Sequence, residues 1–184
     1  MEIKRISWNG METFNTHENL IMEILAERNA VVHSTVNGTI NQMKVIVNYE
    51  VHINEKWQVN AVSINGHLDD EFISWHYLFA SNRWLTDDGG KEFPLGYYDI
   101  DISVSPFTNT LAINRLMLKV GEKKTINVLY FDVLEQRVYI ASQCYTRLDQ
   151  QLYRFENTEG DFMAEITIDE DGFVINYPKL FKRL

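Results

Sequence analysis

Two carboxylates and a guanidinium lie within one short stretch of the chain. Asp99 and Asp101 are two residues apart in residues 97–104, and Arg115 follows. In a strand, both carboxylates would lie on one face, where they repel if both are desolvated unless a cation lies between them. Arg115 is the nearest candidate cation in the sequence, and its planar guanidinium suits carboxylates.

Three interpretations of this stretch remain open. The first is a structural network of Asp and Arg that joins a strand to residues 108–110, whose side chains can bond local backbone. The second is the polar end of a pocket, where the carboxylates and Asn109 exchange hydrogen bonds with sugar hydroxyls. The third is an acid–base pair. Glycosidase carboxylates lie about 5–9.5 Å apart, and two same-face strand positions fall near the lower edge of that range and point in parallel.

Other motifs that carry chemistry are absent from the sequence. It has no GxxxxGK[ST], GxGxxG, HExxH or GxSxG motif, which argues against most nucleotide-dependent and zinc-hydrolase chemistry. Its five histidines are well separated, so we expect no metal site and no cofactor. The single cysteine, Cys144, alternates onto a face with Val138 and Ile140, and we interpret it as a buried small hydrophobic residue rather than a nucleophile.

The elements that must position these residues are mainly strands. Residues 44–53 alternate between apolar and polar side chains, and residues 162–169 repeat that pattern. Asp171-Gly172 then supplies the left-handed backbone that a tight hairpin requires. Further β-rich runs cover residues 30–36, 57–64, 72–79, 97–104, 125–131, 137–148 and 152–156, with Asn37-Gly38, Asn65-Gly66 and Gly89-Gly90 expected between strands. This spacing predicts a largely antiparallel sheet that is curled or closed.

Three stretches favour helical structure. Residues 18–28 consist of good helix formers, so local propensity predicts a helix there. Residues 69–75 and 106–115 could each hold a short helical turn. Asp69 and Ser105 are suitable N-caps, and Pro106 suits a first helical position.

Composition and charge narrow the class of protein. The chain has 184 residues, of which 45% are hydrophobic, and its net charge is −9. We expect one globular domain over residues 1–184. The acidic balance argues against nucleic-acid binding, and no run approaches the roughly 18 apolar residues of a membrane span. A single cysteine permits no intrachain disulfide, which fits a cytoplasmic location.

The segment around Asp99 also carries a family resemblance. Residues 99–102, 106–111 (Pro-Phe-Thr-Asn-Thr-Leu) and 113–116 look like the signature of the Putative glycolipid-binding family of bacterial proteins. Other matching pieces follow in the same order, clearly over residues 44–184 and loosely before them. These pieces are residues 47–51, 82–84, 143–148, 153–156 and 168–178.

The resemblance implies an all-β, mainly antiparallel fold. It predicts a single strongly curved sheet, a spiral β-roll with at most short helical turns, similar to the half-barrels of bacterial lipoprotein carriers. It also implies that residues 18–28 are strand rather than helix, because sheet packing overrides local propensity. The family tends to have proline and a basic residue where this chain has Ala112 and Asn114, which weakens any headgroup contact that needs two cations.

The resemblance also implies a function. We expect a non-enzymatic protein that binds a glycolipid or another amphiphile, with an apolar cradle for the acyl chain and a polar rim. The residues expected at the polar end are Trp84, Tyr97, Asp99, Asp101, Asn109, Arg115, Gln143 and Tyr145. Two alternatives are an enzyme that acts on a sugar or lipid through Asp99 and Asp101, and a structural or interaction module.

Overall fold

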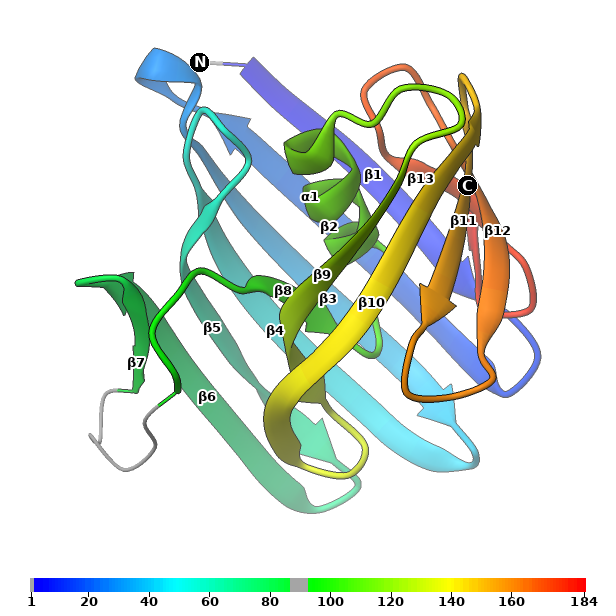
Figure 1. Ribbon diagram of the computed structural model, residues 1–184. Helices are drawn as coiled ribbons and strands as arrows, with labels where there is room; N and C mark the ends of the chain where they lie inside the picture. Colours follow the sequence, from blue (N-terminus) through cyan, green and yellow to red (C-terminus); the bar gives the residue numbers. More distant parts are fainter. Residues whose placement is uncertain (1, 87–92) are drawn as a thin grey trace. The chain divides into compact units, whose positions relative to one another are not determined.

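The structure of the protein is a computed structural model that describes residues 2–86 and 93–184 (Figure 1). The chain divides into two compact units. The first runs to Tyr97 and includes Leu184, and the second runs from Tyr98 to Arg183. Strands dominate both units and nearly all pair antiparallel, so the prediction of an all-β, mainly antiparallel fold is confirmed.

Residues 2–86 form an antiparallel meander in which each strand pairs with the next one in the sequence. A short 3-10 helix, η1, separates the second strand from the third. The elements are β1 (Glu2–Gly10), β2 (Phe14–Ile24), η1 (Ala26–Arg28), β3 (Ala30–Ile40), β4 (Met43–Ile53), β5 (Val59–Leu68), β6 (Glu71–Ala80) and β7 (Arg83–Thr86).

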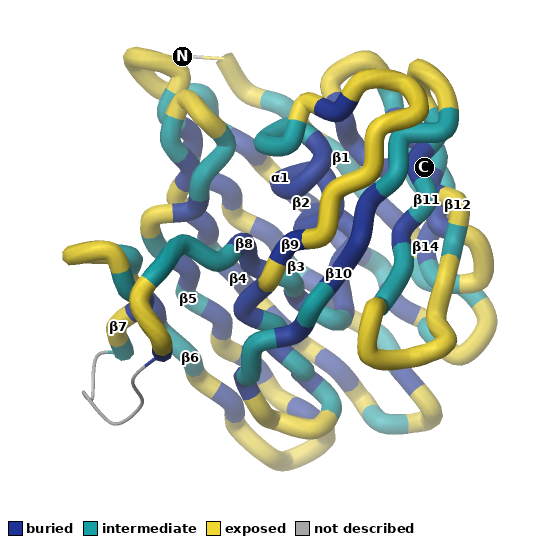
Figure 2. The backbone as a smooth tube through the Cα atoms, in the orientation of Figure 1, coloured by how far each residue is buried: buried dark blue, intermediate teal, exposed yellow. Residues whose placement is uncertain are grey.

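The strands of this meander bury one face. In β4, Val45, Val47 and Val51 are fully buried, whereas Lys44 and His52 are exposed. The same alternation of buried and exposed residues continues along the neighbouring strands (Figure 2). The period-two pattern over residues 44–53 therefore predicted this strand and its buried face.

The helix that local propensity predicts over residues 18–28 is wrong. Strand β2 extends to Ile24, and only Ala26–Arg28 are helical, in η1. β2 pairs along its length with both β1 and β3, and its Leu20 and Met22 are buried. Backbone pairing on both sides and burial of one face outweigh helix propensity here, as the family resemblance implied.

Two expected turns are also wrong. Asn37-Gly38 lies inside β3 and Asn65-Gly66 inside β5. A Cβ atom on Gly66 would lie 2.1 Å from the carbonyl oxygen of Ile46, so this glycine allows close approach of two paired strands. The expected turn at Gly89-Gly90 lies outside the described residues.

The helical turn expected over residues 69–75 is wrong as well. Asp69 and Asp70 form the turn of a β-hairpin, and β6 starts at Glu71. The Asp69 carboxylate accepts a hydrogen bond from the backbone N–H of Lys44 (2.9 Å), which lies 25 residues earlier on β4. Asp69 therefore supports the sheet and does not cap a helix.

The second unit contains seven further strands and one α-helix among its described residues. In the order β14–β13–β12–β11–β10–β9–β8, all neighbours are antiparallel except β8 and β9, which are parallel and are connected through α1. The elements are β8 (Asp99–Ile102), α1 (Phe107–Leu116), β9 (Lys123–Asp132), β10 (Arg137–Asp149), β11 (Leu152–Asn157), β12 (Met163–Ile168), β13 (Val174–Tyr177) and β14 (Phe181–Arg183).

Helix α1 begins where the sequence predicted but is longer than a single turn. The Ser105 hydroxyl accepts a hydrogen bond from the backbone N–H of Phe107 (3.1 Å), as an N-cap does. Pro106 already has helical dihedral angles. The helix continues for 10 residues to Leu116, and the left-handed backbone of Met117 closes the last turn. It packs on β8 and β13.

The predicted hairpin between β12 and β13 is confirmed. Gly172 has a φ of +85°, and the Asp169 carboxylate accepts hydrogen bonds from the backbone N–H groups of Asp171 (3.0 Å) and Phe173 (2.9 Å). The other oxygen of Asp169 pairs with Arg183. The turn is thus held by one aspartate that bonds to local backbone and to a distant cation.

Candidate functional site

Helix α1 and strands β8 and β10 assemble a set of polar side chains in the second unit. We call it the polar cluster, and it consists of Asp99, Asp101, Thr108, Asn109, Arg115, Gln143 and Tyr145. Six of the eight predicted site residues belong to it. Thr108 and Arg115 are seven residues apart, which places them on the same face of α1, two turns apart.

Asp99 and Arg115 form a bidentate ion pair. Arg115 Nε donates to Asp99 Oδ1 (2.5 Å), and its Nη2 donates to Asp99 Oδ2. Asp99 is only 2% exposed, so its charge requires such a partner inside the protein. Arg115 is the cation that the sequence predicts for these carboxylates, and the structure shows that it pairs with Asp99.

Asp101 is held by neutral donors instead. The Thr108 hydroxyl donates to Asp101 Oδ1 (2.6 Å), and the Gln143 amide donates to Asp101 Oδ2 (2.6 Å). Burial raises the pKa of Asp101, although these hydrogen bonds and one from the backbone of Ile102 act in the opposite direction. The two carboxylates of β8 therefore differ, because only Asp99 has a bidentate guanidinium partner.

Gln143 has one polar atom left over. Its side chain is 4% exposed, and its Oε1 has no hydrogen-bond partner among the residues that the structure describes. The Thr110 hydroxyl on α1 is likewise fully buried and without a partner in the described part of the chain. A buried polar group left unpaired costs about 1–3 kcal/mol, so Gln143 Oε1 is suited to accept a hydrogen bond from a bound hydroxyl.

Tyr145 connects the polar cluster to aromatic side chains. Its hydroxyl donates to Asn109 Oδ1 (3.0 Å), and burial raises its pKa well above the ordinary value, so it remains a donor. Its ring lies 5.3 Å from that of Phe155. From there an aromatic row continues with centroid separations of 6.1–6.2 Å, formed by Tyr145, Phe155, Phe162, Tyr177 and Phe181.

The remaining two predicted site residues lie in the first unit. Trp84 on β7 is fully buried, and its ring lies 5.6 Å from that of Phe79. Tyr97 packs edge-on against Phe79 at 5.2 Å, and its hydroxyl accepts a hydrogen bond from the backbone N–H of Val59 (2.8 Å). Both residues thus have packing roles within their own unit, and their role in binding stays a prediction.

The first unit contains a buried carboxylate that is not among the predicted site residues. Glu18 on β2 is 2% exposed, and its Oε1 accepts hydrogen bonds from the hydroxyls of Ser34 (2.8 Å) and Tyr49 (2.6 Å). Local propensity placed Glu18 in a helix, which hid its position. Strand alternation would have found it, because Glu18 shares the buried face with Leu20 and Met22.

Other candidates from the sequence have simpler environments. Cys144 is buried, as predicted for a small hydrophobic residue. In the described part of the chain, no group of three His, Cys, Asp or Glu side chains is arranged to hold a metal ion. Over residues 2–86 and 93–184, no helix has the length and apolar character needed to span a membrane.

Comparison with known proteins agrees with the resemblance seen in the sequence. The family model described as Putative glycolipid-binding matches residues 5–183. A crystal structure of a DUF1089 family protein from Pseudomonas aeruginosa is 31% identical, with a TM-score of 0.75, covering 91% of this chain and 92% of that chain. No curated protein matches the chain. Because the family model spans nearly the whole sequence, the chain belongs to the Putative glycolipid-binding family.

Proposed function

We propose that the protein binds a glycolipid or a similar neutral amphiphile without chemical conversion, and that the polar cluster receives the hydroxyl-bearing end. The observation that carries this proposal is the buried Gln143 Oε1, which has no partner among the described residues. A sugar hydroxyl is a fitting partner, since it donates to an amide oxygen and can accept from another donor. The family description points to the same class of ligand.

The charges favour a neutral polar end. Arg115 is the cation of the polar cluster, and Asp99 already matches its charge with two hydrogen bonds. The family tendency for a second basic residue is lost at Asn114, whose amide donates to the backbone carbonyl of Asp171 (2.9 Å). With a net charge of −9 on the chain, an anionic headgroup would meet repulsion.

The aromatic row places mostly buried apolar rings next to the polar cluster. Tyr145 belongs to both, so a ligand that bonds near Gln143 would meet aromatic rings directly beyond it. Phe162, which contacts both Phe155 and Tyr177, is 43% exposed, so the row reaches the surface of its unit at this residue. Burying an acyl chain along such rings contributes about 0.8 kcal/mol per CH₂ group. We propose that the row accommodates the chain of the amphiphile.

The contacts of the two carboxylates lead us to favour binding over catalysis. A catalytic pair needs one carboxylate to act on the substrate and the other to donate a proton or activate water. Asp99 is engaged by Arg115, and both oxygens of Asp101 are engaged by Thr108 and Gln143.

A cytosolic location remains our proposal, because the one cysteine of the chain is free and buried.

Native mass spectrometry of the full chain purified from cells tests this function. We expect a co-purified molecule of lipid mass on the wild-type protein, and its loss from a Gln143→Met variant, which keeps the side-chain size but removes the amide. Gln150→Met, at an exposed glutamine, is the matched control and should retain the adduct. A wild-type protein that stays empty, even after addition of an alkyl glycoside, would contradict the proposal.

A further inference from the structure

The solvent-facing side of β1–β6 carries a cross-strand row of polar side chains. The pairing register places one residue from each strand in this amide row, which consists of Ser7, Asn19, Thr35, Asn48, Asn65 and Ser74. Every member is an amide or a hydroxyl. Asparagine is unfavourable in strands, so three of them at matching positions are not explained by strand propensity.

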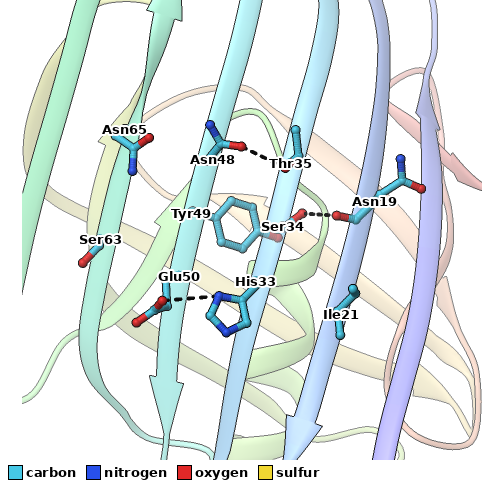
Figure 3. A pocket seen from close by; sticks show the side chains of 10 residues that line it. All are labelled: Asn19, Ile21, His33, Ser34, Thr35, Asn48, Tyr49, Glu50, Ser63 and Asn65. Atoms are coloured by element: carbon cyan, nitrogen blue, oxygen red, sulfur yellow. Dashed lines mark hydrogen bonds and ion pairs between the residues drawn. The ribbon is translucent and has the colours of Figure 1, made fainter.

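Part of the amide row lines a hollow. Asn19, Thr35, Asn48 and Asn65 lie along one side of a trough of about 460 Å³ that crosses β2–β5 (Figure 3). The adjacent cross-strand row lines the other side, with Ile21, His33, Glu50 and Ser63. The trough therefore runs across the strands, between two rows of side chains.

Hydrogen bonds within the amide row fix which way its amides face. The Ser7 hydroxyl donates to Asn19 Oδ1 (2.8 Å), and the Thr35 hydroxyl donates to Asn48 Oδ1 (2.8 Å). Both amide oxygens are thus occupied. Among residues 2–86, no group accepts a hydrogen bond from the Nδ2 atoms of Asn19 and Asn48, so both remain donors to a ligand.

The opposite side of the trough carries the Glu50 carboxylate, whose two oxygens can each accept more than one hydrogen bond. Glu50 lies between two imidazoles, with Oε2 3.3 Å from His33 Nδ1 and Oε1 2.6 Å from His52 Nε2. No lysine or arginine is among the described residues that line the trough, which disfavours phosphate and carboxylate ligands. Donors on one side and a carboxylate on the other suit hydroxyl groups, which both donate and accept.

We propose that this trough binds neutral pyranose rings, with a short oligosaccharide lying across β2–β5. Neighbouring strands are about 4.8 Å apart, close to the length of one pyranose ring, so successive rings would each meet a new polar side chain. Ile21, which is 37% exposed, offers an apolar contact for the C–H face of a ring. The inference does not rest on the proposed function, because its residues belong to the first unit and none is in the polar cluster.

Titration of the ¹⁵N-labelled full chain with maltotriose, cellotriose and N-acetylchitotriose tests the proposal by NMR. We expect saturable shifts of the side-chain amide signals of Asn19, Asn48 and Asn65 with at least one of these sugars. Asn48→Leu should weaken binding about tenfold, since it removes a donor from the trough. Asn37→Leu, at an exposed asparagine on the same side of β3, is the matched control and should bind like the wild type.

A second arm separates a free glycan from a lipid headgroup. Dodecyl maltoside should shift the same amide signals if the trough also accepts the sugar of an amphiphile. Shifts at Gln143 with the detergent, but none in the trough with any sugar, would overturn this inference and leave the proposed function standing. Equal weakening by Asn48→Leu and Asn37→Leu would also overturn it.

Discussion

At the residue scale, the Asp101 carboxyl is surrounded by groups with opposite effects on its charge. Burial raises its pKa, while the hydrogen bonds from Thr108 and Gln143 lower it, and burial is the larger effect. Nearby Tyr130, Tyr145 and Tyr177 also have raised pKa values, partly because of the Asp101 charge, so they stay protonated throughout the acidic range. The Asp101 carboxyl is therefore the member of this group expected to titrate there.

The Asp101→Asn variant tests this environment through the pH dependence of stability. The folded protein holds the Asp101 proton more tightly than the unfolded chain. The protonated carboxyl therefore stabilises the folded state below the ordinary pKa of 3.8, and this contribution is lost as pH rises through the raised pKa of Asp101 in the folded protein. The variant lacks this group, and its free energy of unfolding should fall less over that range. Urea unfolding at a series of pH values measures both curves, and parallel curves would contradict the assignment.

A second prediction at this scale concerns the buried Glu18. Tyr49→Phe removes one of the two hydroxyls that donate to Glu18 Oε1, which leaves a buried carboxylate with fewer donors. We expect a loss of about 1.5–3 kcal/mol in the free energy of unfolding. Tyr139→Phe is the control, because the Tyr139 hydroxyl makes no hydrogen bond in the described part of the chain, and it should cost much less. Equal losses of unfolding free energy in the two variants, measured by urea unfolding, would show that the hydrogen bond from Tyr49 to Glu18 does not stabilise the fold.

At the scale of elements, the β12–β13 hairpin is tied to the end of α1 by a close contact. A Cβ atom on Gly172 would lie 2.6 Å from the side-chain amide of Asn114, and the φ of +85° already disfavours any other residue. The Asn114 amide also donates to the backbone carbonyl of Asp171. Gly172 thus serves both the turn and the packing of α1 against it.

Replacing this glycine separates the two effects. Gly172→Ala and Gly121→Ala both place a side chain at positive φ, +85° and +88° respectively, at a cost of about 1–2 kcal/mol each. Only Gly172→Ala also meets a neighbour, since nothing lies within 4 Å of a Cβ at Gly121. We expect a larger drop in Tm for Gly172→Ala, partly restored by adding Asn114→Ala. Identical drops in Tm for Gly172→Ala and Gly121→Ala would show that the contact with Asn114 does not constrain this position.

The elements also show which parts of the fold could be predicted from sequence. β4 could be predicted, because its apolar residues alternate strictly and bury one face. β2 could not be predicted from propensity, because its residues favour a helix and only pairing with β1 and β3 makes them a strand. Asn65-Gly66 has the composition of a turn. Gly66 is instead needed because β4 approaches it closely, and no local sequence pattern shows that approach.

At the scale of the whole molecule, the family membership is the reason why we propose a glycolipid, and the net charge of −9 is the reason why we propose a neutral one. The sequence and its family resemblance predicted six residues that the structure brings together around α1, and strand alternation places Asp99 with Asp101, and Gln143 with Tyr145, on one face of their strands. It could not predict how they pair. Which of Asp99 and Asp101 pairs with Arg115 depends on the seven-residue spacing of Thr108 and Arg115 on α1, since Thr108 bonds to Asp101 and Arg115 to Asp99. Which amide oxygen is left unpaired depends on the buried surroundings of Gln143.

A crystal structure of the full chain with a bound alkyl glycoside tests whether the polar cluster binds the sugar end of an amphiphile. We expect electron density for a sugar hydroxyl within hydrogen-bond distance of Gln143 Oε1, with the alkyl chain against the rings of Tyr145 and Phe155. Density for the ligand elsewhere, with Gln143 Oε1 still unpaired or bonded only to water, would contradict it.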